Sequence, residues 1–352
     1  MDFKNFRTEE EYISQMHSGA LLNPRIDSTF KALFTSPTKE AHDALHSFLE
    51  AATERKIRTF ALTATEAPME FVGQRGVSYD IACEFDDGFS ADIEMQAFAQ
   101  KYDYGKRAEY QVARLETTYL KKGSRWESAP VVYQITVLDF AYDPKNKDVV
   151  SRYAMRTKDG RELSNSLNVV FIDLTKVTGI EDRLEENTKI ENWAVFLKDA
   201  DNPDKQGIIK TLTDKEEGLM QAQKSLSSIS SDRDLWFAQY RQEIAEIDRI
   251  SNMHAMMQDG LEKGKTEGLA LGKAEGLALG RAEGRAEGRA EGRAEGRAEG
   301  RAEGRAEGRA EGKNEAKREI VMNAFKMGLS LSQIAQISGL NEDEVKEIAD
   351  RS

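Results

Sequence analysis

The chain has 352 residues, of which 39% are hydrophobic and 32% charged, and its formal net charge is −12. No stretch approaches the roughly 18 consecutive apolar residues of a membrane-spanning helix, and the first residues lack the apolar run of a signal peptide. The acidic balance argues against a general nucleic-acid coat, which needs many Lys and Arg contacts to phosphate, but not against a local basic groove. A single cysteine, Cys83, forms no intramolecular disulfide, so we expect a cytoplasmic protein.

Residues 1–205 are expected to form one domain in which helices and strands alternate. Apolar residues at helical spacing predict helices in STFKALFTS, which follows Asp27, in AHDALHSFLEAA, and at 103–121. Alternating and β-branched runs predict strands at 77–85, 89–96, 131–140, 149–156 and 167–174. Strands separated by helices indicate the α/β class.

The rest of the chain is predicted to be helical and divided into three parts. Residues 206–260 are a polar helical extension, residues 261–312 a repeat helix or spacer, and residues 313–352 a small C-terminal helical module. Within the repeats, residues 281–312 are eight consecutive copies of Arg-Ala-Glu-Gly.

A repeat of four residues is close to the helical period, so like residues form stripes that drift about 40° per copy. Residues four apart are Arg with Arg and Glu with Glu, which removes the attractive i,i+4 pairs of a stable single helix. Each glycine costs roughly 1 kcal/mol relative to alanine. The sequence therefore leaves two interpretations open: a solvated spacer, or a coiled-coil-like dimer in which Arg and Glu pair between two chains.

The C-terminal module carries two helix start signals and a turn. Ser330 with Gln333 and Asn341 with Glu344 fit capping boxes, and Gly339 between them fits a turn. The order predicts helix-turn-helix spacing. Its second helix, NEDEVKEIAD, is acidic and repels phosphate, which favours a protein contact or a structural cap over DNA reading.

The segment GVSYDIACEFDDGFSADIEMQAF predicts a β-hairpin, because Asp-Asp-Gly is turn chemistry between two alternating runs. With the turn centred on Asp87, Asp80 and Glu94 lie opposite each other, about 5 Å apart at Cβ. Gln96 points to the same face as Glu94. The other face is expected to pack with the side chains of Tyr79, Ile81, Cys83, Ile93 and Met95.

Two opposed carboxylates and an amide suit a hard divalent cation, since Mg²⁺ takes one or two carboxylates together with water and substrate phosphate. The alternative is that these polar residues only cover the wet face of a half-buried hairpin. The pair His42 and His46 lacks a third zinc ligand, and no glycine-rich phosphate loop indicates a nucleotide cofactor.

The chain resembles the Rpn family of recombination-promoting nucleases and transposases, a branch of the PD-(D/E)XK nucleases. The resemblance covers roughly residues 20–200 and, more loosely, the tail. It rests on five segments in order: DSTFKALF at 27–34, YDI at 79–81, IEMQ at 93–96, KRAEYQVARLETTYLKKG at 106–123 and APVVYQITVLDF at 129–140.

This resemblance implies a mixed central sheet flanked by helices and a Mg²⁺-dependent cut in DNA, with Mn²⁺ or Ca²⁺ as alternative ions. It implies that Asp80 and Glu94 bind the metal and that Gln96 stands where most relatives of the superfamily have lysine. Glutamine only hydrogen-bonds, so another cation is needed to stabilise developing charge.

The candidates for that cation are Lys31, Lys106 and Arg107. Asp27 is either the N-cap of its helix or, by its place in the matched motif, an auxiliary site residue.

Two other functions remain open. One is a catalytically inactive nuclease fold that recruits protein or DNA through its tail; the missing lysine and the acidic charge favour it. The other is a DNA-binding regulator acting through residues 328–350, which predicts salt-sensitive DNA binding by the tail.

Overall fold

The computed structural model describes residues 8–66, 75–99, 102–119, 123 and 125–350. The chain divides into two compact units, Met1–Asn252 and Met253–Ser352, and each is described by itself. None of the described helices is long and apolar enough to cross a membrane.

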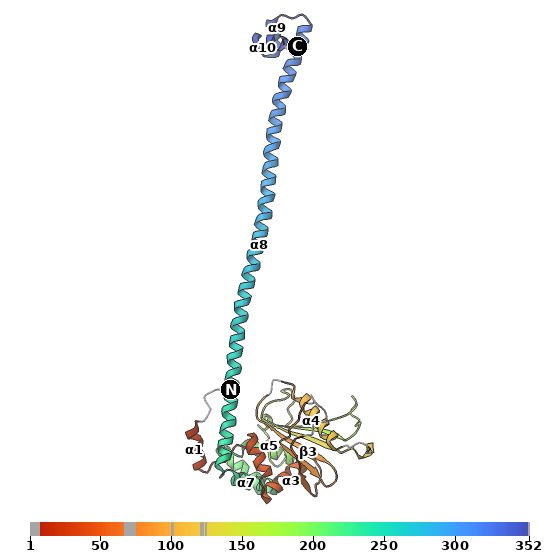
Figure 1. Ribbon diagram of the computed structural model, residues 1–352, viewed down its shortest axis with the longest axis vertical. Coiled ribbons are helices and arrows are strands. Elements are labelled where there is room, and N and C mark those ends of the chain that lie inside the picture. Colours follow the sequence, from red (N-terminus) through yellow and green to blue (C-terminus); the bar gives the residue numbers. More distant parts are fainter. Residues whose placement is uncertain (1–7, 67–74, 100–101, 120–122, 124, 351–352) are drawn as a thin grey trace. The chain divides into compact units, whose positions relative to one another are not determined.

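The first unit is built on a mixed sheet that contains β3 (Figure 1). The sheet has six strands in the order β1-β2-β3-β4-β6-β5. Its centre is parallel, since β3 pairs with β4 and β4 with β6 in the parallel sense, whereas β1, β2 and β5 pair in the antiparallel sense. The strands are β1 (Phe60–Leu62), β2 (Ile81–Phe85), β3 (Ser90–Gln96), β4 (Val132–Leu138), β5 (Val150–Ala154) and β6 (Leu167–Asp173). The predicted α/β class is confirmed, and β1 is the strand that the sequence pattern does not reveal.

Helices pack on both faces of this sheet, so its central strands are buried on both sides. The helices are α1 (Glu9–His17), α2 (Asp27–Thr35), α3 (Lys39–Thr53), α4 (Tyr104–Tyr119), α5 (Lys189–Asp199), α6 (Gln206–Lys215) and α7 (Glu217–Ile229). Trp193 of α5 lies at the centre of the larger core, in contact with the rings of Phe34, Phe48 and Phe196. The opposite face packs against α4 through Tyr104, Ala108, Val112 and Leu115.

The first unit continues past residue 205, where the sequence suggests that the domain ends. Leu212 of α6, Leu226 of α7 and Trp236 of α8 (Arg233–Lys326) are buried in the same core as Trp193. The start of α8 also holds α2 through hydrogen bonds, because the hydroxyl of Ser28 donates to Gln242 Oε1. Residues 206–252 are thus part of the compact unit.

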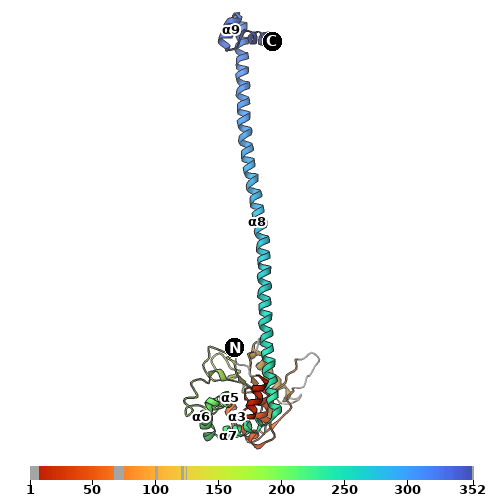
Figure 2. The same ribbon diagram turned by 90° about the vertical axis from the view of Figure 1, so that its left-hand side faces the viewer.

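The second unit consists of the remainder of α8 followed by α9 (Leu331–Ser338) and α10 (Glu342–Asp350). The Arg-Ala-Glu-Gly copies are helical (Figure 2). Every residue from 254 to 316 is exposed. The end of α8 packs against α9 and α10 through a small core of Val321, Ala324, Ile334 and Val345.

The turn chemistry of the C-terminal module agrees with the sequence analysis. Gly339 is left-handed with φ of 67°, as a helix C-terminus favours. The main-chain N–H of Glu344 donates to Asn341 Oδ1, and that of Asn341 donates to Glu344 Oε2. The predicted capping box at the start of the last helix is confirmed.

The burial of Leu33 in α2 predicts a large loss of stability on truncation. Leu33 is fully buried, and we expect Leu33→Ala to lower the free energy of unfolding of the first unit by about 2–5 kcal/mol, because a cavity remains. All three tryptophans lie in this unit, so denaturant unfolding followed by tryptophan fluorescence measures it. The matched control is Leu163→Ala, at a residue 72% exposed, which we expect to change the unfolding free energy by less than about 0.5 kcal/mol. Equal effects would contradict this assignment of the core.

Candidate functional site

The predicted hairpin is present with the predicted register. Ile81 pairs with Ile93 and Glu84 with Ser90, so the turn is centred on Asp87, and Gly88 takes φ of 80°. Asp80 directly precedes the last pair, Ile81 with Ile93, and lies close enough to Glu94 for its charge to act on that carboxyl. The main-chain N–H of Met95 donates to Asp80 Oδ2 at 3.2 Å.

The alternation of side chains between the two faces of the hairpin does not hold at the start of its first strand. The sequence predicts Tyr79 on the same packed face as Ile81, but Tyr79 lies in the opposite cluster, against α4. The strand β2 begins only at Ile81, so the two-residue period does not extend back to Tyr79.

Glu94 lies beneath α4, not on a wet face. Its side chain is 1% exposed, and both of its oxygens accept hydrogen bonds from that helix. The hydroxyl of Tyr104 donates to Oε2 at 2.9 Å, Nη2 of Arg107 lies 3.2 Å from Oε2, and Nε2 of Gln111 donates to Oε1. Burial raises the pKa of Glu94, the charge of Arg107 opposes the rise, and the charge of Asp80 adds to it.

Asp80 is held from the other side by α2. Lys31 Nζ lies 3.0 Å from Asp80 Oδ1 and 3.3 Å from Asp27 Oδ2, so one ammonium links the two acids. Burial raises the pKa of Asp80, the neighbouring charge of Asp27 adds to it, and Lys31 lowers it.

Asp27 does not have the capping role that the sequence permits. The N-cap of α2 is Ile26, without a side-chain capping bond, and Asp27 is the first residue of the helix. Its carboxylate lies beside Lys31 instead.

A groove of about 450 Å³ opens beside these acids within the first unit. Asp80, Gln96 and Asp27 line one part of it, and Gln242, Glu246 and Arg249 of α8 line another. The amide of Gln96 donates to Glu94 Oε2 at 3.4 Å, which places Gln96 on the face of Glu94, as predicted.

Direct contacts join six of the seven predicted site residues in two sets: Lys31 with Asp27 and Asp80, and Glu94 with Gln96 and Arg107. Lys106 is the exception. It lies on the exposed side of α4, and its main-chain N–H donates to Asp103 Oδ1.

Asp92 is a candidate site residue that the sequence analysis misses. It is fully buried two residues before Glu94, and neither of its carboxyl oxygens has a hydrogen bond of normal geometry. Burial raises the pKa of Asp92 well above its ordinary range, and the charges of Glu94 and Asp80 add to the rise. Gln134, opposite Asp92 in the β3–β4 register, offsets only part of this. The available signal was the alternation of four polar residues along β3, at 90, 92, 94 and 96.

Tyr104 and Gln111 are also missed as partners of Glu94. Together with Arg107 they lie three and four residues apart, which puts them on one face of α4. The spacing was visible in the sequence, but nothing in it indicated that this face covers β3.

The side chains at this site suit a hard cation by their chemistry, since carboxylate and amide oxygens surround the mouth of the groove. Within the described ranges, no three His, Cys, Asp or Glu side chains lie close enough to form a ready-made cluster. Two carboxylates suffice for Mg²⁺, because water and phosphate complete its shell.

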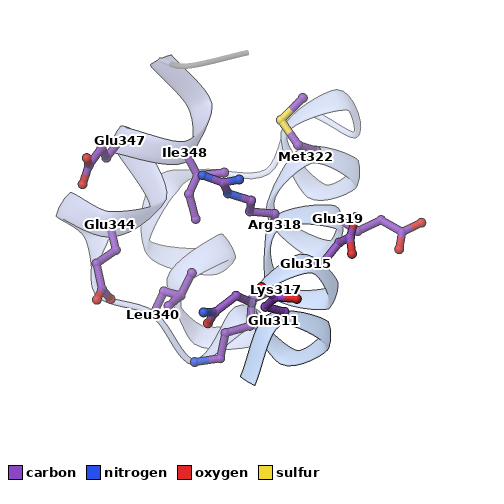
Figure 3. Close-up of a pocket in the computed structure, with 11 residues that line it drawn as sticks. Glu311, Glu315, Lys317, Arg318, Glu319, Met322, Leu340, Glu344, Glu347 and Ile348 are labelled. Atoms are coloured by element: carbon purple, nitrogen blue, oxygen red, sulfur yellow. The ribbon is translucent and has the colours of Figure 1, made fainter. Parts of the chain in front are cut away.

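Another groove, of about 1060 Å³, belongs to the second unit, between the end of α8 and α10 (Figure 3). Five glutamates border it, and they outnumber the basic residues Lys317 and Arg318. An acidic rim repels phosphate, so this groove does not suit a nucleic-acid substrate.

The burial of Asp92 without normal hydrogen bonds predicts that a neutral isostere stabilises the metal-free protein. A buried group that lacks its partners costs about 1–3 kcal/mol, and an ionised one costs more. We expect Asp92→Asn to raise the free energy of unfolding at pH 7 in EDTA by about 1 kcal/mol or more, measured by denaturant titration. The control Asp148→Asn, at an exposed position, should leave it unchanged. A destabilised Asp92→Asn protein would mean that the native carboxylate has favourable partners.

The comparisons with known proteins agree with the motifs of the sequence. The model of the PD-(D/E)XK nuclease family transposases matches residues 24–255, which include the hairpin, α4 and the first turns of α8. No curated protein and no solved structure matches the chain. Because the match covers well over half of the chain, this protein belongs to the PD-(D/E)XK nuclease family transposases.

Proposed function

We propose that the protein is a divalent-metal-dependent DNA endonuclease that hydrolyses phosphodiester bonds, in the context of recombination or transposition. Its family supports the nuclease chemistry and DNA as the substrate. The observation that carries the proposal is that the charge of Asp80 acts on Glu94 at the open end of the β2–β3 hairpin, with Asp80 and Gln96 at the wall of one groove.

Asp80 and Glu94 are the proposed metal ligands, with Mg²⁺ as the preferred ion and Mn²⁺ or Ca²⁺ as alternatives. Such an ion lowers the pKa of bound water and neutralises charge that builds on the scissile phosphate. Gln96 is proposed to orient water or substrate through its amide at the mouth of the groove.

The helix α4 positions Glu94 in this scheme. Tyr104, Arg107 and Gln111 donate to its two oxygens, and these bonds fix the orientation of the carboxylate. Partners of this kind orient metal ligands in proteins and tune their basicity.

Lys31 is proposed to supply the positive charge that Gln96 lacks. Its ammonium lies 3.0 Å from Asp80, and its side chain is 39% exposed, so substrate phosphate can reach it. Burial would lower the pKa of Lys31, but the charges of Asp80 and Asp27 raise it, which keeps the ammonium protonated. Arg107 is more tightly engaged with Glu94, and Lys106 lies on the exposed side of α4.

The metal-ligand assignment predicts that purified protein nicks or linearises plasmid DNA with Mg²⁺ and that Asp80→Ala and Glu94→Ala abolish this. Gel electrophoresis of the plasmid measures the cleavage. The matched control is Glu84→Ala, because Glu84 lies in the same hairpin on an exposed position, and its variant should cut normally. Undiminished cleavage by the Asp80 and Glu94 variants would remove the assignment.

The alternative is a catalytically inactive nuclease fold that serves as a DNA- or protein-interaction module through its helical tail. The observation in its favour is that both oxygens of Glu94 already accept hydrogen bonds from α4. Calorimetric titration with Mg²⁺ or Mn²⁺ separates the two functions. An active site should bind the ion and lose this binding in Glu94→Ala, whereas an inactive scaffold should show no binding that depends on Glu94.

The role proposed for Lys31 predicts a kinetic effect without loss of the metal. We expect Lys31→Ala to lower kcat on the order of 100-fold, as for loss of one charge-stabilising group, with Mg²⁺ affinity nearly unchanged. Lys31→Arg should restore part of the rate. The control Lys39→Ala removes an ammonium that is 80% exposed and pairs with Asp43, and should have no effect. If Lys31→Ala weakens only metal binding, the residue positions Asp80 and does not act on the substrate.

We also propose that the protein self-associates through the repeat segment of α8. The support is that this segment is helical and exposed over its whole length.

A further inference from the structure

The glycines of α8 have no explanation within one chain. They recur at every fourth residue from Gly260 to Gly312, and a Cβ built at any of them meets no atom within 4 Å. Alanine is a better helix former than glycine, so a solitary helix would gain from alanine at each of these positions. A ladder of glycines in a helix is favoured where another backbone approaches closely.

The charges of the repeats also lack partners in one chain. Within residues 281–312, all of which the structure describes, no Arg or Glu forms an ion pair, although pairs occur elsewhere in the chain. The reason is the period: side chains three and four residues apart are neighbours on a helix, and the Arg–Glu spacing in each copy is two.

The repeat arranges these residues in four stripes. With 100° per residue, Arg follows the glycine stripe along one side and Glu along the other, each about 80° away, and Ala lies opposite. The glycine stripe is therefore a surface without side chains. It is bordered by the arginine stripe on one side, called the positive wall, and by the glutamate stripe on the other, called the negative wall.

We propose that this surface binds a second copy of the chain in parallel orientation, with the glycine ladders facing each other. A parallel partner, related by a two-fold axis along the helices, presents its walls in the reverse order, so Arg of one copy meets Glu of the other. An antiparallel partner, turned about a perpendicular axis, sets Arg against Arg and Glu against Glu. Opposite charges across such an interface fix its orientation, and like charges exclude the alternative.

The segment before the repeats sets the register. Two copies of Leu-Ala-Leu-Gly, at 269–272 and 277–280, replace both charged walls with leucine, and these leucines are exposed in the single chain. In a parallel pair without stagger, leucine meets leucine at both places. A shift by one repeat would set leucine against the Lys and Glu of residues 273–276, and an antiparallel pair would set it against Arg and Glu of the repeats.

The glycine stripe is the buried one, and the alanine stripe faces outward. Glycine is uninterrupted from 260 to 312, whereas the alanine positions hold Glu262 and Thr266 near the start. Because the period of four exceeds 3.6, the stripes wind in the right-handed sense, and the pair crosses as small-residue pairs do.

Disulfide trapping in the full chain tests the orientation, since the native Cys83 is buried. We expect Gly264→Cys and Gly308→Cys each to form a covalent dimer alone under mild oxidation, and Ala306→Cys, on the outward stripe, to form little. An antiparallel pair would link only a mixture of the two glycine variants. That result, or a monomer by light scattering with no trapping by any of them, overturns the proposal.

A charge-exchange variant tests the recognition. It carries Arg→Glu and Glu→Arg together in all eight copies, so that its own parallel pair stays complementary while its pair with the native chain sets like charges together. We expect the variant to dimerise as the native chain does, and native mass spectrometry of refolded mixtures to find mixed dimers several-fold below the statistical proportion. Mixed dimers at or above that proportion would overturn it. Neither test depends on nuclease activity. Failure of the parallel-dimer proposal can therefore be distinguished from failure of the proposed nuclease function.

Discussion

The burial of a carboxylate under a helix is the constraint on which the rest of the first unit depends. Glu94 sits in the central part of the sheet with 1% of its side chain exposed, where an unpaired charge is costly. The donors of α4 offset this cost, and α4 can supply them only if it lies directly over β3. The polar contacts that hold the candidate site therefore also determine which helix covers this face of the sheet.

The same constraint separates what the sequence predicts from what it does not. The hairpin register and the shared face of Glu94 and Gln96 follow from a turn signal and a period of two, both of which are local. The contact of Lys31 with Asp80 joins residues 49 positions apart and depends on how α2 packs against the sheet. The sequence does not indicate Asp92 as a site residue, because a period of two predicts a half-buried hairpin, whereas β3 is covered on both faces.

The helical tail shows the opposite relation between sequence and structure. Its repeats predict stripes and the absence of internal ion pairs from helix geometry alone, and the structure agrees with both. The end of the first unit is harder to predict from the sequence. Residues 206–252 are mostly polar and give a weak hydrophobic pattern, although a few of them, such as Trp236, are buried in the core.

The exposed middle of α8 can tolerate changes in the number of four-residue copies. Each copy of four residues adds about one and a ninth helical turns, or about 6 Å, and touches neither hydrophobic core. An in-frame gain or loss of twelve nucleotides therefore alters the length of the helix without disturbing folding at either end. The start of α8 has no such freedom, because it is held to α2 by the hydrogen bond of Ser28 to Gln242.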